Sequence, residues 1–102
     1  MKIFCITPFE TLKIYLDRHV ITEHHHHELK NGKIVAVVNF HDTNSEEKFL
    51  AEPGVVALPH PLSAQVLNHE HEAHLSEFGI KAGDSLYAAT KKLAAHHPLL
   101  RF

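Results

Sequence analysis

Histidine is the residue type with the greatest chemical potential in this sequence. There are 12 histidines among 102 residues, as many as aspartate and glutamate together. An isolated imidazole titrates near pH ~6.5, and its neutral form is a common metal ligand. The formal charge is −2 with neutral histidines, and the uptake of 12 protons would bring it to +10. We therefore expect the net charge to change sign over a narrow, nearly physiological pH range.

The densest run of histidines, His24–His27, lies just before a predicted turn. Asn31-Gly32 is typical of a two-residue type I′ turn, because both residues tolerate positive φ. Residues 33–40 follow and form the longest run of β-branched and apolar residues in the chain. We predict a β-hairpin of residues 19–29 and 33–40, with the second strand central to a sheet.

A two-residue turn would also define which residues face each other across the hairpin. It gives three cross-strand pairs: Leu29 with Ile34, His27 with Ala36, and His25 with Val38. Because successive side chains of a strand point to opposite faces, His24 and His26 would lie on the other face. Histidines two apart on one face lie about 6.5–7 Å apart, close enough to share a metal ion. A polar edge strand that resists aggregation explains the run equally well.

A second cluster, His69-Glu70-His71-Glu72-Ala73-His74, falls within a predicted helix. His71 and His74 are three residues apart and share a helix face, where imidazoles can hold Zn²⁺ or a similar divalent metal. The zinc-protease pattern His-Glu-x-x-His is not met, because Ala73 stands four residues after His69. A solvated helix face that titrates with pH is the simpler interpretation. The candidate ligands for zinc, nickel or copper are His25, His27, His69, His71 and His74.

Catalytic chemistry has little support in the sequence. His60 lies between Pro59 and Pro61, which stiffen the loop, and it is the best general base for a small hydrolase or isomerase. Cys5 stands in an apolar run, which predicts a buried core residue and not a nucleophile. The sequence has no Gly-x-Ser-x-Gly motif and no phosphate-binding glycine loop. We therefore favour a protein that is not an enzyme.

The segments on either side of the hairpin complete the predicted sheet. Residues 1–6 predict a first strand, and residues 8–17 predict a helix, although their apolar residues also alternate as in a strand. The polar residues 41–47 predict a loop. A short strand over 48–51 and a buried strand over 55–58 follow.

Two helices are predicted in the C-terminal part. The first runs from about residue 63 to 77 with Ser63 as its cap, and the second from 85 to 96 with Asp84 as its cap. The tail, residues 99–102, is apolar and should dock onto the domain. The expected fold is a single α+β domain over 1–102: a mixed or antiparallel sheet of about four strands with two C-terminal helices packed on it.

These features favour a binding or interaction module that is histidine-rich, pH-responsive and cytoplasmic. A homodimer is expected, because residues 33–40 are apolar on both faces and a partner chain could cover one of them. No apolar run is long enough to span a membrane, and the N-terminal apolar stretch is too short for a signal peptide. The mildly acidic charge balance disfavours nucleic acid as a partner. The sequence defines no small-molecule ligand.

Overall fold

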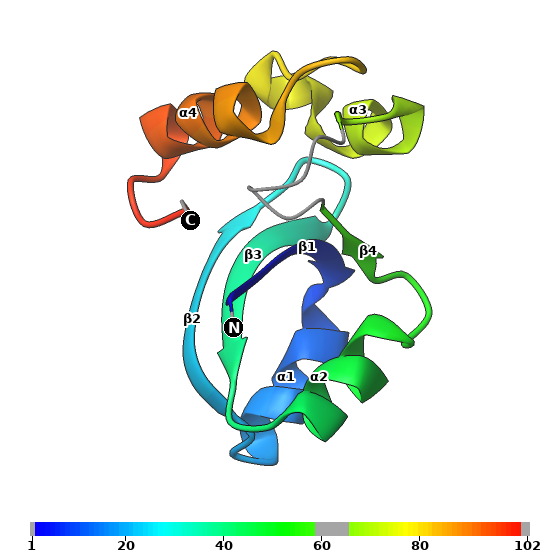
Figure 1. The fold of residues 1–102 in the computed structure, drawn as a ribbon, viewed down its shortest axis with the longest axis vertical. Helices are drawn as coiled ribbons and strands as arrows, with labels where there is room; N and C mark the ends of the chain where they lie inside the picture. The colour runs from blue at the N-terminus through cyan, green and yellow to red at the C-terminus, as the bar shows by residue number, and fades with distance from the viewer. Residues whose placement is uncertain (1, 59–65, 101–102) are drawn as a thin grey trace.

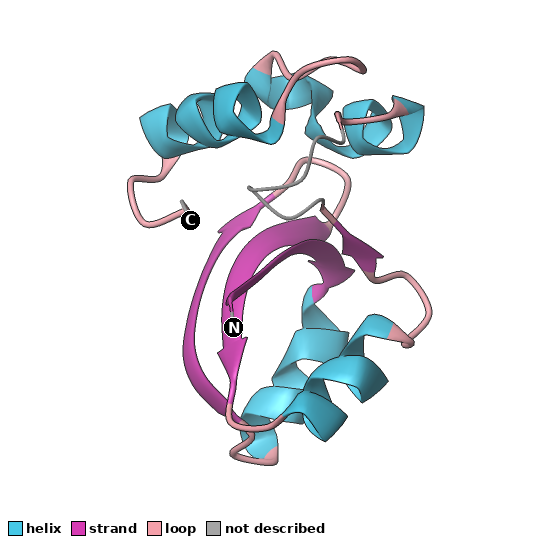
Figure 2. Cartoon of the chain, viewed as in Figure 1, coloured by secondary structure: helices cyan, strands magenta, loops and turns pink. Residues whose placement is uncertain are grey.

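The apolar segment at residues 33–40 forms an inner strand of a four-stranded sheet. In the computed structural model, which describes residues 2–58 and 66–100, this strand is β3 (Lys33–Phe40). It pairs with β2 (Ile21–Glu28) on one side and with β1 (Lys2–Pro8) on the other. The short strand β4 (Val56–Ala57) pairs with the far side of β1. The order is β2-β3-β1-β4 and every pairing is antiparallel, which confirms the predicted α+β class (Figure 2).

Two helices connect the strands of this sheet. α1 (Phe9–Asp17) joins β1 to β2, as predicted for residues 8–17, and α2 (Thr43–Leu50) joins β3 to β4. The two helices lie next to each other at one side of the sheet (Figure 1). The order β1-α1-β2-β3-α2-β4 with this strand arrangement is the ferredoxin-like topology.

Both faces of β3 are buried by helices of the same chain. On one face, Ile34, Ala36, Val38 and Phe40 pack with residues of β1, α1 and α2, among them Leu12, Tyr15 and Phe49. On the other face, Val35 and Val37 pack with the C-terminal part, including Leu75, Phe78 and Leu93. The chain thus accounts for the apolar character of both faces without a partner. The apolar faces of β3 therefore no longer argue for the predicted dimer, which stays a prediction.

The C-terminal part contains α3 (His69–Leu75), a 3₁₀ turn η1 (Ser76–Phe78) and α4 (Leu86–His96). α3 is shorter than predicted because Asn68 caps it, and the predicted cap Ser63 lies outside the described residues. Ser85, and not Asp84, caps α4 by accepting a hydrogen bond from the Ala88 amide. Leu100 is fully buried, as expected for the part of the tail that the structure describes.

The prediction of a loop at residues 41–47 followed by a strand at 48–51 is wrong. These residues form α2, whose N-terminus is capped by Asp42: its carboxylate accepts hydrogen bonds from the amide and the hydroxyl of Ser45. Only Phe49 of this helix is buried, so its sequence lacks the apolar periodicity by which helices are recognised. The cap and this single anchor hold a mostly polar helix in place.

The predicted hairpin is confirmed, but its register was predicted incorrectly by one residue. Asn31 does not adopt the positive φ that a type I′ turn needs, whereas Gly32 has φ 84°. The loop is therefore three residues long, closed by the Leu29 amide on the Lys33 carbonyl (2.8 Å) and the Gly32 amide on the Leu29 carbonyl (3.2 Å).

The observed register moves the side chains of residues 23–28 to the opposite face from the one predicted. The cross-strand pairs are Glu28 with Ile34, His27 with Val35, His26 with Ala36, His25 with Val37 and His24 with Val38. His25 and His27 consequently face the C-terminal helices, and His24 and His26 face α1.

Gly32 should be the residue of this turn that is least tolerant of a side chain. Nothing lies within 4 Å of a Cβ added there, so the cost of Gly32→Ala comes from the left-handed backbone alone. We expect about 1–2 kcal/mol of lost stability. Gly32→Asn should cost less, since asparagine visits this conformation more readily. Guanidinium unfolding of the three proteins measures both effects, and an alanine variant as stable as wild type would refute this account of the turn.

Candidate functional site

The histidine-rich strand β2 is an edge of the sheet, and this position leaves half of its main-chain groups without a partner strand. The Leu29 amide bonds to β3, and in an antiparallel pair such residues alternate with residues that point outward. The N–H and C=O groups of His24, His26 and Glu28 therefore point away from β3. Among residues 2–58 and 66–100, no main-chain hydrogen bond engages these outward groups. Glu28 is exposed and the histidines are half-buried, so the edge is accessible.

On the α1 side, the imidazoles of β2 stack on one another. The rings of His24 and His26 are nearly parallel, with centroids 5.6 Å apart, and the ring of Phe9 lies 5.4 Å from that of His26. Burial lowers the pKa of His24, and the charged forms of His26 and His25 lower it further. This stack is therefore held most readily with neutral rings.

On the opposite face, β2 contacts the segment that follows α4. The ring of His27 lies 5.4 Å from Phe78 and 5.9 Å from His97, and His96 packs on Phe78 at 4.9 Å. In Figure 1 this segment leaves α4 and turns back toward the sheet. The buried Nδ1 of His97 has no hydrogen-bond partner among the described residues.

His25 is the one imidazole of the run with a close carboxylate. Its Nε2 lies 3.0 Å from Oε1 of Glu23, two residues earlier on the same face of β2. Both side chains are partly exposed, so the pair is weakly stabilising.

The histidines of α3 make structural contacts of their own. The Nδ1 of the buried His71 accepts a hydrogen bond from the Asn68 amide (3.1 Å) and completes the capping box at the start of the helix. The Nδ1 of His74 lies 3.2 Å from Nδ2 of Asn31 and so ties α3 to the hairpin turn. Burial lowers the pKa of His74, and the positive charge of Lys33 adds to this effect. His69 is exposed.

The proposed metal ligands are not assembled into one site. The contacts of α3 reach the hairpin turn, whereas His25 and His27 face Glu23 and the C-terminal segment. Within the described part of the chain, no group of three or more histidine, cysteine, aspartate or glutamate side chains could hold a metal ion. His96 and His97 were not among the site residues predicted from the sequence, because their role depends on how α4 packs against β2. Their place at a helix end before Pro98 was the available signal.

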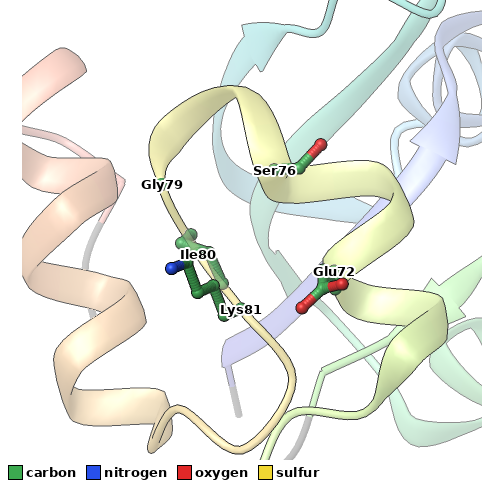
Figure 3. A pocket seen from close by; sticks show the side chains of 5 residues that line it. All are labelled: Glu72, Ser76, Gly79, Ile80 and Lys81. Carbon is green, nitrogen blue, oxygen red and sulfur yellow. The ribbon is translucent and has the colours of Figure 1, made fainter.

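A pocket of about 280 Å³ lies between α3 and the connection to α4 (Figure 3). It is lined by Glu72, Ser76, Gly79, Ile80 and Lys81. One oxygen of Glu72 is already engaged, since Oε2 accepts a hydrogen bond of 2.7 Å from the Ala82 amide. This bond makes Glu72 a structural contact of the connection, and no histidine among the residues that the structure describes lines the pocket.

The two other residues considered for catalysis were Cys5 and His60. Cys5 is fully buried, and burial raises the pKa of its thiol to about 12, so it is an unreactive core residue as predicted. His60, with its flanking prolines, lies outside the described residues.

Comparisons of the chain with protein-family models, curated proteins and solved structures gave no match. None of the helices in residues 2–58 and 66–100 has the length and apolar content needed to cross a bilayer. The ferredoxin-like topology serves many unrelated activities, so the function must be inferred from the site itself.

The lowered pKa values of His24 and His74 predict that acid destabilises the fold. In the unfolded chain these histidines return to about pH 6.5, so below that pH the unfolded state binds more protons than the folded state. The free energy of unfolding should hold above about pH 7 and fall as the pH drops toward about 5.5. Denaturant titrations at several pH values measure this slope.

Variants assign the effect to these two residues. His24→Gln and His74→Gln should each flatten the pH dependence, whereas His69→Gln, at an exposed position of α3, should leave it unchanged. If all three variants keep the wild-type slope, the burial of His24 and His74 is not its cause.

Proposed function

We propose that this protein is a non-catalytic interaction module that binds an extended polypeptide segment along the outer edge of β2, in a manner controlled by pH. The observation that carries the proposal is an edge strand of eight residues whose outward main-chain groups belong to a run of histidines. Addition of a strand to an exposed sheet edge is a common mode of peptide recognition, in which main-chain hydrogen bonds supply affinity.

The histidines make this edge suitable for binding at neutral pH. Exposed edges are usually protected by charged side chains, which disfavour the approach of another strand. Neutral imidazoles supply no such charge, and their rings offer flat surfaces beside the strand. Protonation would place several positive charges on consecutive residues and would protect the edge again. A neutral cytoplasmic environment would therefore correspond to the binding state of the module.

The proposal is supported by the way the rest of the sheet is covered or shortened. Both faces of β3 are covered by helices, and the opposite edge strand, β4, has only two residues. Within the described part of the chain, β2 is the long edge that remains accessible.

Selection of peptides tests the proposed function. A library of random ten-residue peptides displayed at about pH 7.5 should yield binders whose amide chemical-shift changes concentrate at His24, His26 and Glu28. His26→Pro removes an outward N–H that the domain itself does not use, and proline is tolerated at such edge positions. This variant should bind the peptides at least about tenfold more weakly.

The matched control is His26→Gln, which keeps the outward N–H and should retain binding. Affinity for the selected peptides should fall on acidification to about pH 5.5. Peptides whose shifts map away from β2, or a selection that yields none, would overturn the proposal.

Metal binding is a second candidate, favoured by the contact between His27 and His97. Their rings belong to different elements and lie 5.9 Å apart, which is near the separation of two imidazoles on one metal ion. Two protein ligands with water would form a weak zinc, nickel or copper site.

A metal bound only by the folded state must raise the melting temperature. We expect a rise with Zn²⁺, Ni²⁺ or Cu²⁺ at neutral pH in protein purified without a nickel column, and no rise in His97→Gln. A His69→Gln control should behave as wild type. An unchanged melting temperature with all three ions would eliminate the metal site.

A further inference from the structure

We infer that the extended segment bound at the edge of β2 is the β2 strand of a second copy of this chain, joined by a two-fold axis into one continuous sheet. The inference rests on the proposed function, because it names the partner for the same edge. The apolar faces of β3 play no part in it, since the chain covers them itself.

The outward groups of β2 are suited to pair with themselves. In a two-fold antiparallel pair, residues whose main-chain groups point outward must face residues of the same kind. If the axis passes at His26, the two copies of His26 exchange hydrogen bonds, and His24 of each copy faces Glu28 of the other. These three positions could form about six main-chain hydrogen bonds across the interface.

The position of Glu28 favours this register over the one centred at His25. Glu28 is exposed, and within the described residues no carboxylate forms an ion pair with His24, whose pKa is lowered by burial and by the neighbouring His26 and His25. In the dimer the neutral imidazole of each His24 would gain a facing carboxylate, to which a ring N–H can donate a hydrogen bond across the two strands. A register centred at His25 would instead place His24 opposite His26 and leave Glu28 without a basic partner.

The other histidines make the dimer sensitive to acid. At the axis the two copies of His26 face each other, and on the C-terminal side His25 of each copy faces His27 of the other. Glu23 is the carboxylate beside His25, and His97 and His96 add further imidazoles near His27 and Phe78. On the α1 side the rings that meet His26 are the uncharged Phe9 and the imidazole of His24 in the same strand. Protonation therefore adds more repulsive pairs than attractive ones, and the dimer should dissociate as the pH falls.

Sedimentation velocity of the full chain measures the equilibrium, from about 1 to 500 µM protein and at about pH 7.5 and 5.5. We expect a dimer at the higher pH whose dissociation constant rises at least about tenfold at the lower pH. Glu28→Lys should weaken the dimer about tenfold at pH ~7.5, because it replaces both facing carboxylates with cations. The double variant His24→Glu with Glu28→Lys should restore it, since each pair then joins a carboxylate to an ammonium group.

Glu47→Lys, an equal change of charge on an exposed position of α2, is the matched control and should leave the dimer unchanged. A wild-type chain that is monomeric at about 500 µM would overturn the inference. A dimer that Glu28→Lys does not weaken, or that the charge reversal does not restore, would overturn it as well. Selected peptides that still bind at β2 would then show that only the identity of the partner was wrong, whereas failure of both experiments would remove the proposed function too.

Discussion

The hydrogen bonds that close the three-residue turn at Gly32 are the constraint on which the site depends. They align Leu29 with Lys33, and this alignment decides the face to which the side chains of residues 23–28 in β2 point. A loop shorter by one residue would direct His25 and His27 toward α1, and His24 and His26 toward the C-terminal helices. Each ring contact of the strand follows from this one choice of register.

The burial of both faces of β3 stabilises that register. A strand that packs apolar residues on both faces cannot slip without moving large side chains into unsuitable surroundings. Pairing with β3 keeps β2 ordered although the sequence of β2 is polar. A rigid inner strand thus presents a run of titratable side chains at a defined edge, half-buried and stacked, where their protonation has structural consequences.

Two sets of histidines in the described part of the chain differ in the contacts they make. His71 and His74 of α3 use ring nitrogens to cap a helix and to hold the hairpin turn, so their contribution is to the fold. Those of β2 and the end of α4 contact one another or the rings of Phe9 and Phe78. Only the second group lies at an open edge, which is why we assign the interaction surface to it.

Much of the architecture was predictable from local sequence, and the segments that were predicted incorrectly are informative. The apolar run at 33–40, the turn residues and the periodicity of the last helix predicted a sheet, a hairpin and a C-terminal helical layer, because burial and turn chemistry leave local signatures. Residues 43–50, which form α2, carry no such signature, because a side-chain cap and the single buried residue Phe49 support this helix. The choice between a two-residue and a three-residue turn at Asn31 and Gly32, and the meeting of His27 with His97, were decided only by tertiary packing. The physical reason is that both depend on energies shared between segments far apart in the chain, which no local pattern of residues contains.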